Sequence, residues 1–355
     1  MGTRSFRTSA GVGLHVQIDG EINGEINGEI NAAGAGRGDV PGEPAAPVTV
    51  ILAHGWTLDS RSWGPVARAL TEGPPGRLPP RVIRYDHRGH GRSELPARAD
   101  MTIDGLADDL AELIAEFAPT GPVVLAGHSM GGMAIMALAE RHPELLASRV
   151  AGVALVSTAS GGLADTNLGL SVRMLGLVRK GEAKLAEAAW VDRRAALSRR
   201  PALLVPAMRA LLVGKGADRG ALRITSRCLA DCRPAVMVGF RPTLNEHDRD
   251  AALAAFDHIP TEVLVGTSDK LTPVYQSRRI VDTARRARLT LYPGAGHMLP
   301  LERVDGVAGR LLGLVETAAE RVAETAADGA RELVVDQLSR GSSGSGPARA
   351  TPAGT

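Results

Sequence analysis

Aromatic side chains make up only 3% of the 355 residues, so the core has to be packed mainly by leucine, valine, isoleucine, alanine and methionine. Cysteine is scarcer still, with only Cys228 and Cys232 in the whole chain. They stand four residues apart in a predicted helix, a spacing that suits a disulfide poorly. No matched histidines accompany them, as a metal site would require, so we interpret both thiols as packing residues.

Long apolar runs and excess charge are also lacking. No uninterrupted apolar stretch approaches the roughly 18 residues that a membrane span needs, and Met1–Ala10 lacks the apolar segment of a secretory signal. We therefore expect a cytoplasmic protein. The formal net charge of +2 is too small to create a field that attracts nucleic acid, so no nucleic-acid partner is predicted.

What the sequence does contain is an alternation of buried strands and amphipathic helices. The strand runs are apolar throughout and are separated by helices of ten or more residues, which is typical of a parallel sheet covered on both faces. The fold class is therefore α/β, with a mostly parallel central sheet and helices on both of its faces. Strands are predicted at 12–18, 48–53, 81–85, 123–126, 150–156, 262–265 and 289–292, and helices at 60–70, 103–117, 131–140, 273–285 and 304–338.

Three segments interrupt this alternation. Residues 20–47 contain three copies of the tetrapeptide GEIN and a Gly/Pro/Ala-rich stretch, and we expect a flexible insertion there. Residues 159–255 show helical periodicity only, which predicts a helical cap inserted between the two parts of the core, 1–158 and 256–338. Residues 339–355 are rich in serine and glycine and are predicted to be a disordered tail.

The strongest chemical signal is the sequence GHSMGG, which follows the strand 123–126 and opens the next helix. A serine between small residues at a strand-to-helix turn projects its hydroxyl above the sheet from a strained backbone. Ser129 is therefore the predicted nucleophile, supported by Gly127 and Gly131. The helix that follows directs its N-terminus at the site, where negative charge would develop.

A serine hydroxyl needs a histidine to take its proton and a carboxylate to orient that histidine. Asp269 and His297 follow successive predicted strands and so emerge at the same edge of the sheet, where catalytic groups gather. We assign His297 as the base and Asp269 as the acid, with Asp165 and Asp257 as alternative acids. Among the other histidines, His128 is expected to pack or form local hydrogen bonds beside the nucleophile. His247 is a minor candidate for the pocket, and His15, His142 and His258 are expected on the surface or in the core.

The oxyanion of a tetrahedral intermediate needs backbone donors placed in advance. One is the N–H of Met130, directly after the nucleophile. The other is predicted from the loop that follows strand 48–53, which reads His54-Gly55-Trp56. Gly55 lets the backbone approach closely, His54 supports the loop, and the Trp56 N–H is the expected second donor.

Five ordered segments together resemble the α/β-hydrolase superfamily over nearly all of residues 10–335. They are HGW at 54–56, DHRGHGRS at 86–93, GHSMGG at 127–132, GTSDKLTP at 266–273 and GAGHMLPLE at 294–302. The chain order of serine, acid and histidine is the one found in that superfamily. The resemblance implies that Asp86, Arg88 and Ser93 form a structural turn beneath the site, and the GHSMGG form is similar to that of monoacylglycerol lipases and carboxylesterases.

The expected activity is hydrolysis of moderately apolar carboxylic esters through an acyl-enzyme, with a small-molecule substrate and no metal or cofactor. C–C bond or lactone hydrolysis, cofactor-free haloperoxidase-like chemistry and a non-hydrolytic ligand sensor stay open as alternatives. The cap contains many leucines and methionines, most of which we expect to pack the cap itself, with enough apolar surface left to line a pocket wall. It is also rich in arginine, which favours a solvated face or, alternatively, a weak contact with an anionic lipid surface.

Overall fold

The computed structural model describes residues 2–20, 47–73, 79–163 and 201–341, with side chains omitted for 203–204 and 325–341. Within these ranges the chain forms one eight-stranded sheet in the order β1-β2-β4-β3-β5-β6-β7-β8. The pairs β1/β2 and β2/β4 are antiparallel and all the others are parallel. The strands are β1 (Gly2–Arg7), β2 (Gly13–Asp19), β3 (Thr49–Ala53), β4 (Arg81–Asp86), β5 (Val123–His128), β6 (Val150–Val156), β7 (Thr261–Gly266) and β8 (Arg288–Tyr292).

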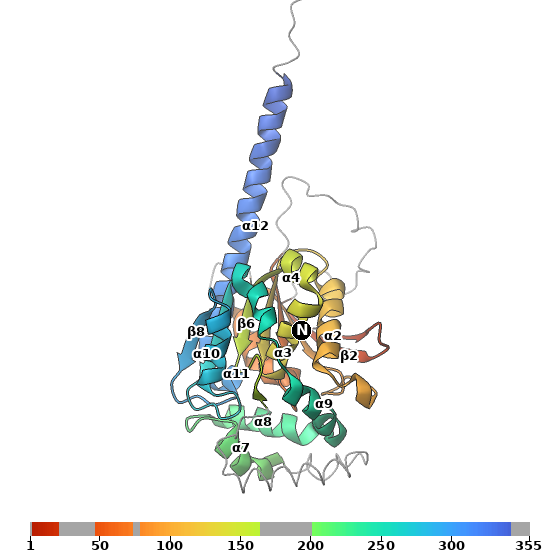
Figure 1. Cartoon of the computed structure of the whole chain (residues 1–355), viewed down its shortest axis with the longest axis vertical. Coiled ribbons are helices and arrows are strands. Elements are labelled where there is room, and N and C mark those ends of the chain that lie inside the picture. The colour runs from red at the N-terminus through yellow and green to blue at the C-terminus, as the bar shows by residue number, and fades with distance from the viewer. Residues whose placement is uncertain (1, 21–46, 74–78, 164–200, 342–355) are drawn as a thin grey trace, which may run out of the picture.

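Helices cover both faces of this sheet, as the strand pattern predicts (Figure 1). Successive residues of β5 illustrate the reason, because Val123 and Leu125 enter one apolar cluster while Val124 and Ala126 enter the other. The first cluster packs under α2 (Ile103–Phe117), α3 (Met130–Arg141), α4 (Pro143–Arg149) and α10 (Val274–Thr283). The second packs under α1 (Gly64–Glu72), α11 (Leu299–Glu302) and α12 (Val304–Gly341).

The described part of the predicted cap contains helices, together with one isolated bridge between Gly161 and Asp248. Its helices α7 (Val205–Leu211) and α8 (Arg219–Asp231) lie at the end of the molecule opposite to the C-terminal end of α12 (Figure 1). Its elements are η5 (Pro201–Leu204), α7 (Val205–Leu211), α8 (Arg219–Asp231), α9 (Pro234–Glu246) and η6 (Ala251–His258), of which η6 runs past residue 255 into the predicted core.

Several predicted boundaries differ from the structure. The strand β1 and the short helix α4 were not expected. The predicted helix 60–70 is a 3-10 turn, η2 (Ser60–Trp63), followed by α1, because Pro65 at the start of α1 fixes a new helical beginning. A further 3-10 turn, η3 (Arg98–Asp100), precedes α2. The helix α12 extends to Gly341, past the predicted end at 338, so the first residues of the predicted tail are helical.

The other parts of the domain prediction fall largely outside the described residues. These are the GEIN insertion, most of 20–47, the cap residues 164–200 and the tail from 342 onward. Among the described residues, no helix combines the length and the apolar character that crossing a bilayer requires.

Candidate active site

Ser129 occupies the sharp turn between β5 and α3, as predicted. Its backbone angles are φ 52° and ψ −117°, a left-handed φ that costs a non-glycine residue energy. The surrounding contacts hold this conformation: the Ser129 N–H donates to the Val156 carbonyl at 2.9 Å, and the Thr158 hydroxyl donates to the Ser129 carbonyl at 2.7 Å. The strain is therefore fixed by the neighbouring strand β6 and the loop after it.

Gly127 and Gly131 are required by close packing at this turn. A Cβ on Gly127 would lie 2.5 Å from the carbonyl carbon of Gly131, and a Cβ on Gly131 would overlap the carbonyl oxygen of Ala53. Both obstacles are backbone atoms, which cannot rotate away. The two glycines thus let α3 start directly against the end of β3, beside the loop that carries the predicted oxyanion donor.

Asp269 and His297 meet at the carboxyl edge of the sheet, from the loops after β7 and β8. The His297 Nδ1 lies 2.9 Å from Asp269 Oδ2 and 3.1 Å from Oδ1, and both residues are at most 5% exposed. A carboxylate only accepts hydrogen bonds, so Nδ1 carries the proton and Nε2 is left as an acceptor. This is the tautomer that a base acting on a serine requires.

Asp269 is itself held by three donors besides His297. Its Oδ1 accepts from the backbone N–H groups of Leu271 at 2.9 Å and Thr272 at 3.0 Å, and its Oδ2 accepts from the Thr272 hydroxyl at 2.9 Å. Burial raises the pKa of Asp269, but the neighbouring His297 and these hydrogen bonds outweigh burial and lower the pKa below its usual value. The carboxylate therefore stays charged at neutral pH.

The His297 loop is anchored by a second histidine and by Glu302. His128 Nε2 donates to the His297 carbonyl at 2.8 Å, and because burial lowers the pKa of His128 to about 3 this ring is neutral. The Glu302 carboxylate accepts from the N–H of Gly296 at 3.0 Å and from the N–H of Gly214, in the cap, at 2.7 Å. Glu302 thus joins the histidine loop to the cap.

The loop after β3 is oriented by His54. The His54 Nδ1 lies 2.8 Å from the Gly55 carbonyl oxygen, and the His87 N–H donates to His54 Nε2 at 2.9 Å, which fixes the Nδ1–H tautomer. Because a trans peptide places C=O and N–H on opposite sides, holding the Gly55 carbonyl turns the Trp56 N–H away from His54. A Cβ on Gly55 would lie 3.2 Å from Ser129 Cβ, so this loop faces the serine.

The second predicted donor, Met130, is the first residue of α3 and its N–H has no acceptor within the helix. Met130 directly follows Ser129, and Gly55, the neighbour of Trp56, lies against Ser129, while the role of the two N–H groups as donors stays a prediction.

The turn after β4 is a rigid support, as the resemblance implies. The Ser93 hydroxyl donates to the Asp86 carbonyl at 2.5 Å, and Arg88 forms two hydrogen bonds of 2.7 Å to Asp109, with both side chains buried. His90 is also buried in this turn, and burial lowers its pKa to about 3.

The structure also gives the positions of several of the remaining candidates. Asp257 lies on η6 before β7, at the opposite edge of the sheet from Asp269, and Asp165 falls outside the described residues. His247 is buried beside the Ala159 carbonyl, and burial lowers its pKa to about 4. His142 is partly exposed, and its Nε2 lies 2.8 Å from Asp108 Oδ1. His15 lines a cavity that none of the proposed catalytic residues lines.

Three supporting residues were not expected from the sequence: Thr272, Glu302 and Asp109. The first two stand inside the segments GTSDKLTP and GAGHMLPLE, at fixed distances from the acid and the histidine, and that spacing was an available signal. Asp109 carries no local signal, since it is one of several acidic residues of α2.

An apolar cluster joins the cap to the site. It contains Leu58 from the end of the loop after β3, Met298 beside His297, and Met208 and Val213 from the cap. Cys228 is buried in the same cluster as a free thiol, which confirms its predicted packing role. Apolar side chains from the core and the cap therefore pack beside the loop that carries His297.

Comparison with known proteins agrees with this fold. The model of the alpha/beta hydrolase family matches residues 50–310. A putative carbamate hydrolase, RutD, of Variovorax paradoxus is 30% identical over 72% of this chain and 86% of its own length. A monoacylglycerol lipase of Mycolicibacterium smegmatis is 30% identical over 70% of this chain and 80% of its own.

Solved structures share the architecture. An enol-lactonase from Burkholderia xenovorans superposes with a TM-score of 0.63 at 22% identity, covering 88% of this chain and all of the lactonase. At this identity the likeness concerns the fold alone. The family match spans the serine turn and the segments carrying Asp269 and His297, and the chain therefore belongs to the alpha/beta hydrolase family and is a hydrolase.

Proposed function

We propose that this hydrolase cleaves carboxylic esters of moderately apolar substrates through an acyl-enzyme on Ser129. The observation that carries the proposal is the buried contact of 2.9 Å between His297 Nδ1 and Asp269 Oδ2, at the sheet edge where Ser129 occupies its strained turn. The contact leaves His297 Nε2 as a base on the edge of the sheet that carries the serine.

In the proposed mechanism the Ser129 oxygen attacks the ester carbonyl while His297 Nε2 takes its proton. The N–H groups of Trp56 and Met130 stabilise the negative charge on the carbonyl oxygen. His297 then gives the proton to the leaving alcohol, and the acyl group stays bonded to Ser129. A water molecule, deprotonated by the same nitrogen, releases the acid and restores the serine. Asp269 stays ionised throughout and stabilises the imidazolium.

The substrate proposal rests on the apolar cluster around the site and on the relatives. Leu58, Met208 and Met298 are at most 5% exposed and pack against one another, so the cap meets the His297 loop through apolar rather than charged contacts. The similarity to a monoacylglycerol lipase supports esters. The similarity to a putative carbamate hydrolase makes carbamates the second acyl class to test.

The experiment compares wild type, Ser129→Ala and Ser148→Ala on p-nitrophenyl esters from acetate to palmitate. Ser148 is an exposed serine of α4 whose hydroxyl bonds to the Glu144 carbonyl, so it is a matched control. We expect turnover in wild type and Ser148→Ala, loss in Ser129→Ala, and an optimum at intermediate chain length. A fluorophosphonate probe should label wild type and Ser148→Ala but not Ser129→Ala.

The alternatives give different results in the same assay. Faster turnover of a p-nitrophenyl carbamate than of any ester would move the assignment to carbamate hydrolysis on the same serine. No turnover of any ester, with Ser129 unreactive toward the probe, would refute the esterase proposal.

A further inference from the structure

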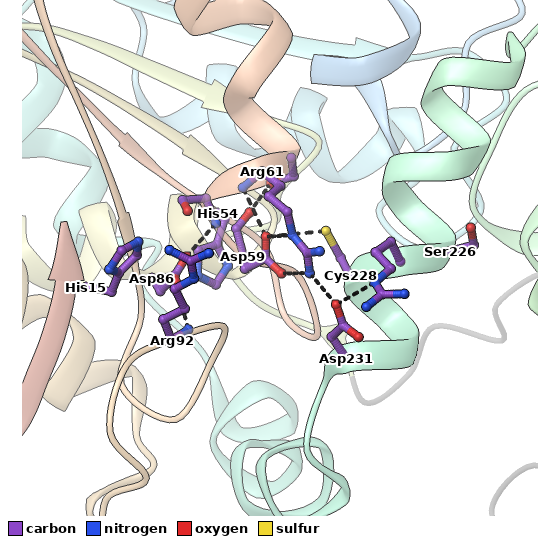
Figure 2. Close-up of polar contacts among 12 residues, drawn as sticks. His15, His54, Asp59, Arg61, Asp86, Arg92, Ser226, Cys228 and Asp231 are labelled. Carbon is purple, nitrogen blue, oxygen red and sulfur yellow. Dashed lines mark hydrogen bonds and ion pairs between the residues drawn. The ribbon is translucent and has the colours of Figure 1, made fainter. Parts of the chain in front are cut away.

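A partly open cavity of about 430 Å³ is lined by none of the proposed catalytic residues. Its walls come from β2, η2, the turn after β4 and the cap helix α8, so core and cap both contribute (Figure 2). The volume falls in the range of roughly 300–1,000 Å³ that is typical of small-molecule sites. The lining is dominated by charged side chains, three aspartates and three arginines.

The aspartates on the core side are already engaged by donors. The two oxygens of Asp86 accept from the backbone N–H groups of Ser60 and Arg92, at 2.8 and 2.9 Å. Both oxygens of Asp59 accept from the Arg61 guanidinium, at 2.8 and 2.6 Å. Because Asp59 and Asp86 are at most 4% exposed and hold η2 and the turn in place, they are structural charges and offer little to a cationic ligand.

Unused donors remain on the core side. The Arg92 side chain is exposed and lines the cavity, and among the described residues its guanidinium forms no ion pair or hydrogen bond, because only its backbone N–H bonds to Asp86. Its five N–H donors suit a carboxylate or a phosphate. From the cap side, Arg227 lines the same cavity, with its Nε donating to Asp231 at 3.0 Å.

The wall formed by β2 contributes an unsatisfied amide. The Gln17 Nε2 lies 3.2 Å from His15 Nε2, and the buried Gln17 Oε1 has no partner among the described residues. Whichever way the amide is turned, one of its polar atoms contacts His15 and the other has no partner. Burial lowers the pKa of His15, so this wall carries no charge at neutral pH. A hydroxyl group, which both donates and accepts, would satisfy the free atom in either orientation.

We propose that this cavity binds a small hydroxylated anion, whose carboxylate or phosphate is held by Arg92 of the core and Arg227 of the cap and whose hydroxyl bonds to Gln17. Such a ligand adds a bridge between core and cap next to the one already formed by Arg61, which donates to Asp59 and, at 2.9 Å, to Asp231 of α8 (Figure 2). Occupancy therefore stabilises the docking of α8 on the core.

The test measures binding in the full-length Ser129→Ala background, so its result does not depend on any hydrolytic activity. Isothermal titration at constant ionic strength uses glycerol 3-phosphate and glycerate as the phosphate and carboxylate probes. Glycerol and inorganic phosphate are the partial ligands. The variants are Arg92→Ala, Gln17→Leu and, as a matched control, Arg98→Ala, an arginine of η3 that does not line the cavity.

We expect at least one of the two acids to bind, Arg92→Ala to weaken it about tenfold or more, and Arg98→Ala to leave it unchanged. Gln17→Leu should reduce its affinity toward that of the simple anion, and glycerol should not bind. Hydrogen exchange of α8 should slow when the cavity is occupied. Since the Arg92 side chain has no partner in the part of the chain that the structure describes, Arg92→Ala should unfold at the wild-type temperature, which would show that the variant is folded.

Three outcomes would overturn the proposal. One is no binding of either acid, and another is equal affinity in wild type and Arg92→Ala. The third is inorganic phosphate binding as tightly as glycerol 3-phosphate with no effect of Gln17→Leu, since the hydroxyl contact would then be wrong.

Discussion

The substitution Asp269→Asn tests the proposed chemistry most directly, because it changes the tautomer of one histidine while keeping the shape of the side chain. In the native structure Oδ1 accepts from two backbone N–H groups and Oδ2 accepts from His297 Nδ1 and the Thr272 hydroxyl. The asparagine oxygen has to take the Oδ1 position to serve the two backbone donors. Its NH2 group therefore faces His297 Nδ1 at about 2.9 Å.

An NH2 group donates, so Nδ1 becomes the acceptor and the proton moves to Nε2. His297 then presents a donor toward the serine and cannot take its proton. Loss of the correct tautomer in a Ser-His-Asp site lowers kcat about 10⁴-fold, which corresponds to about 5.5 kcal/mol of transition-state stabilisation. KM should change little, since Asp269 is buried beneath the histidine and does not reach the substrate.

The assay is steady-state hydrolysis of p-nitrophenyl butyrate by wild type and Asp269→Asn near pH 8, with the labelling rate of Ser129 by a fluorophosphonate measured in parallel. Thermal unfolding of both proteins checks that the variant is folded. A kcat within tenfold of wild type, in a preparation free of wild-type enzyme, would show that Asp269 does not orient the base and would refute the reasoning.

Three further predictions concern stability and the support of the site. Gly131→Ala should fail to fold or lose more than about 3 kcal/mol of unfolding free energy, because the added Cβ meets backbone atoms. Gly309 stands at an open position of α12, so Gly309→Ala should unfold at the wild-type temperature or above it. Equal melting temperatures of the two variants would contradict the packing argument. His90 and His128 have pKa values lowered to about 3, so the stability that their neutral forms provide is complete above the unfolded pKa of 6.5 and is lost as the pH falls toward 3. In urea unfolding, each histidine should contribute about 1.4 kcal/mol per pH unit to the pH dependence of the unfolding free energy near pH 5. If His90→Asn left that pH dependence unchanged, the prediction would be wrong. Glu302→Ala removes the acceptor of two backbone N–H groups and should lower both kcat and the melting temperature, with partial recovery in Glu302→Gln; a variant that matches wild type in both would show that the bridge to the cap is dispensable.

The central strands could be predicted because they are buried on both faces. A strand such as β5 is apolar throughout, so its signal does not depend on its partners. The edge strand β1 gives no such signal: its sequence GTRSFR is polar, and only Phe6 packs against the core. Its pairing with β2 is decided by the hairpin and by backbone hydrogen bonds, which the side-chain pattern does not show.

The positions of Ser129, Asp269 and His297 could be predicted because each follows a parallel strand, and parallel strands end at one edge. The supporting contacts could not, since Arg88 pairs with Asp109 and Glu302 bonds to the N–H of Gly214 across long stretches of chain. Several carboxylates stand close in sequence to each of these, and only packing selects one. The cavity beside Arg92 is hidden for the same reason, because β2 and α8 meet only in the folded chain.

The strand directions have a consequence for how this chain tolerates added sequence. Because β2 runs antiparallel to β4, its end at Asp19 pairs with Val82, near the start of β4, and β3 begins at that same amino edge. The segment carrying the GEIN repeat connects these two points, whereas the cap departs from the carboxyl edge after β6. Length added to the first connection therefore starts from the amino edge of the sheet, whereas length added to the second starts from the carboxyl edge, where Ser129, Asp269 and His297 lie. The first connection is thus the place where a reporter domain or affinity tag could be grafted without altering selectivity, and the second is the place to exchange when a different selectivity is wanted.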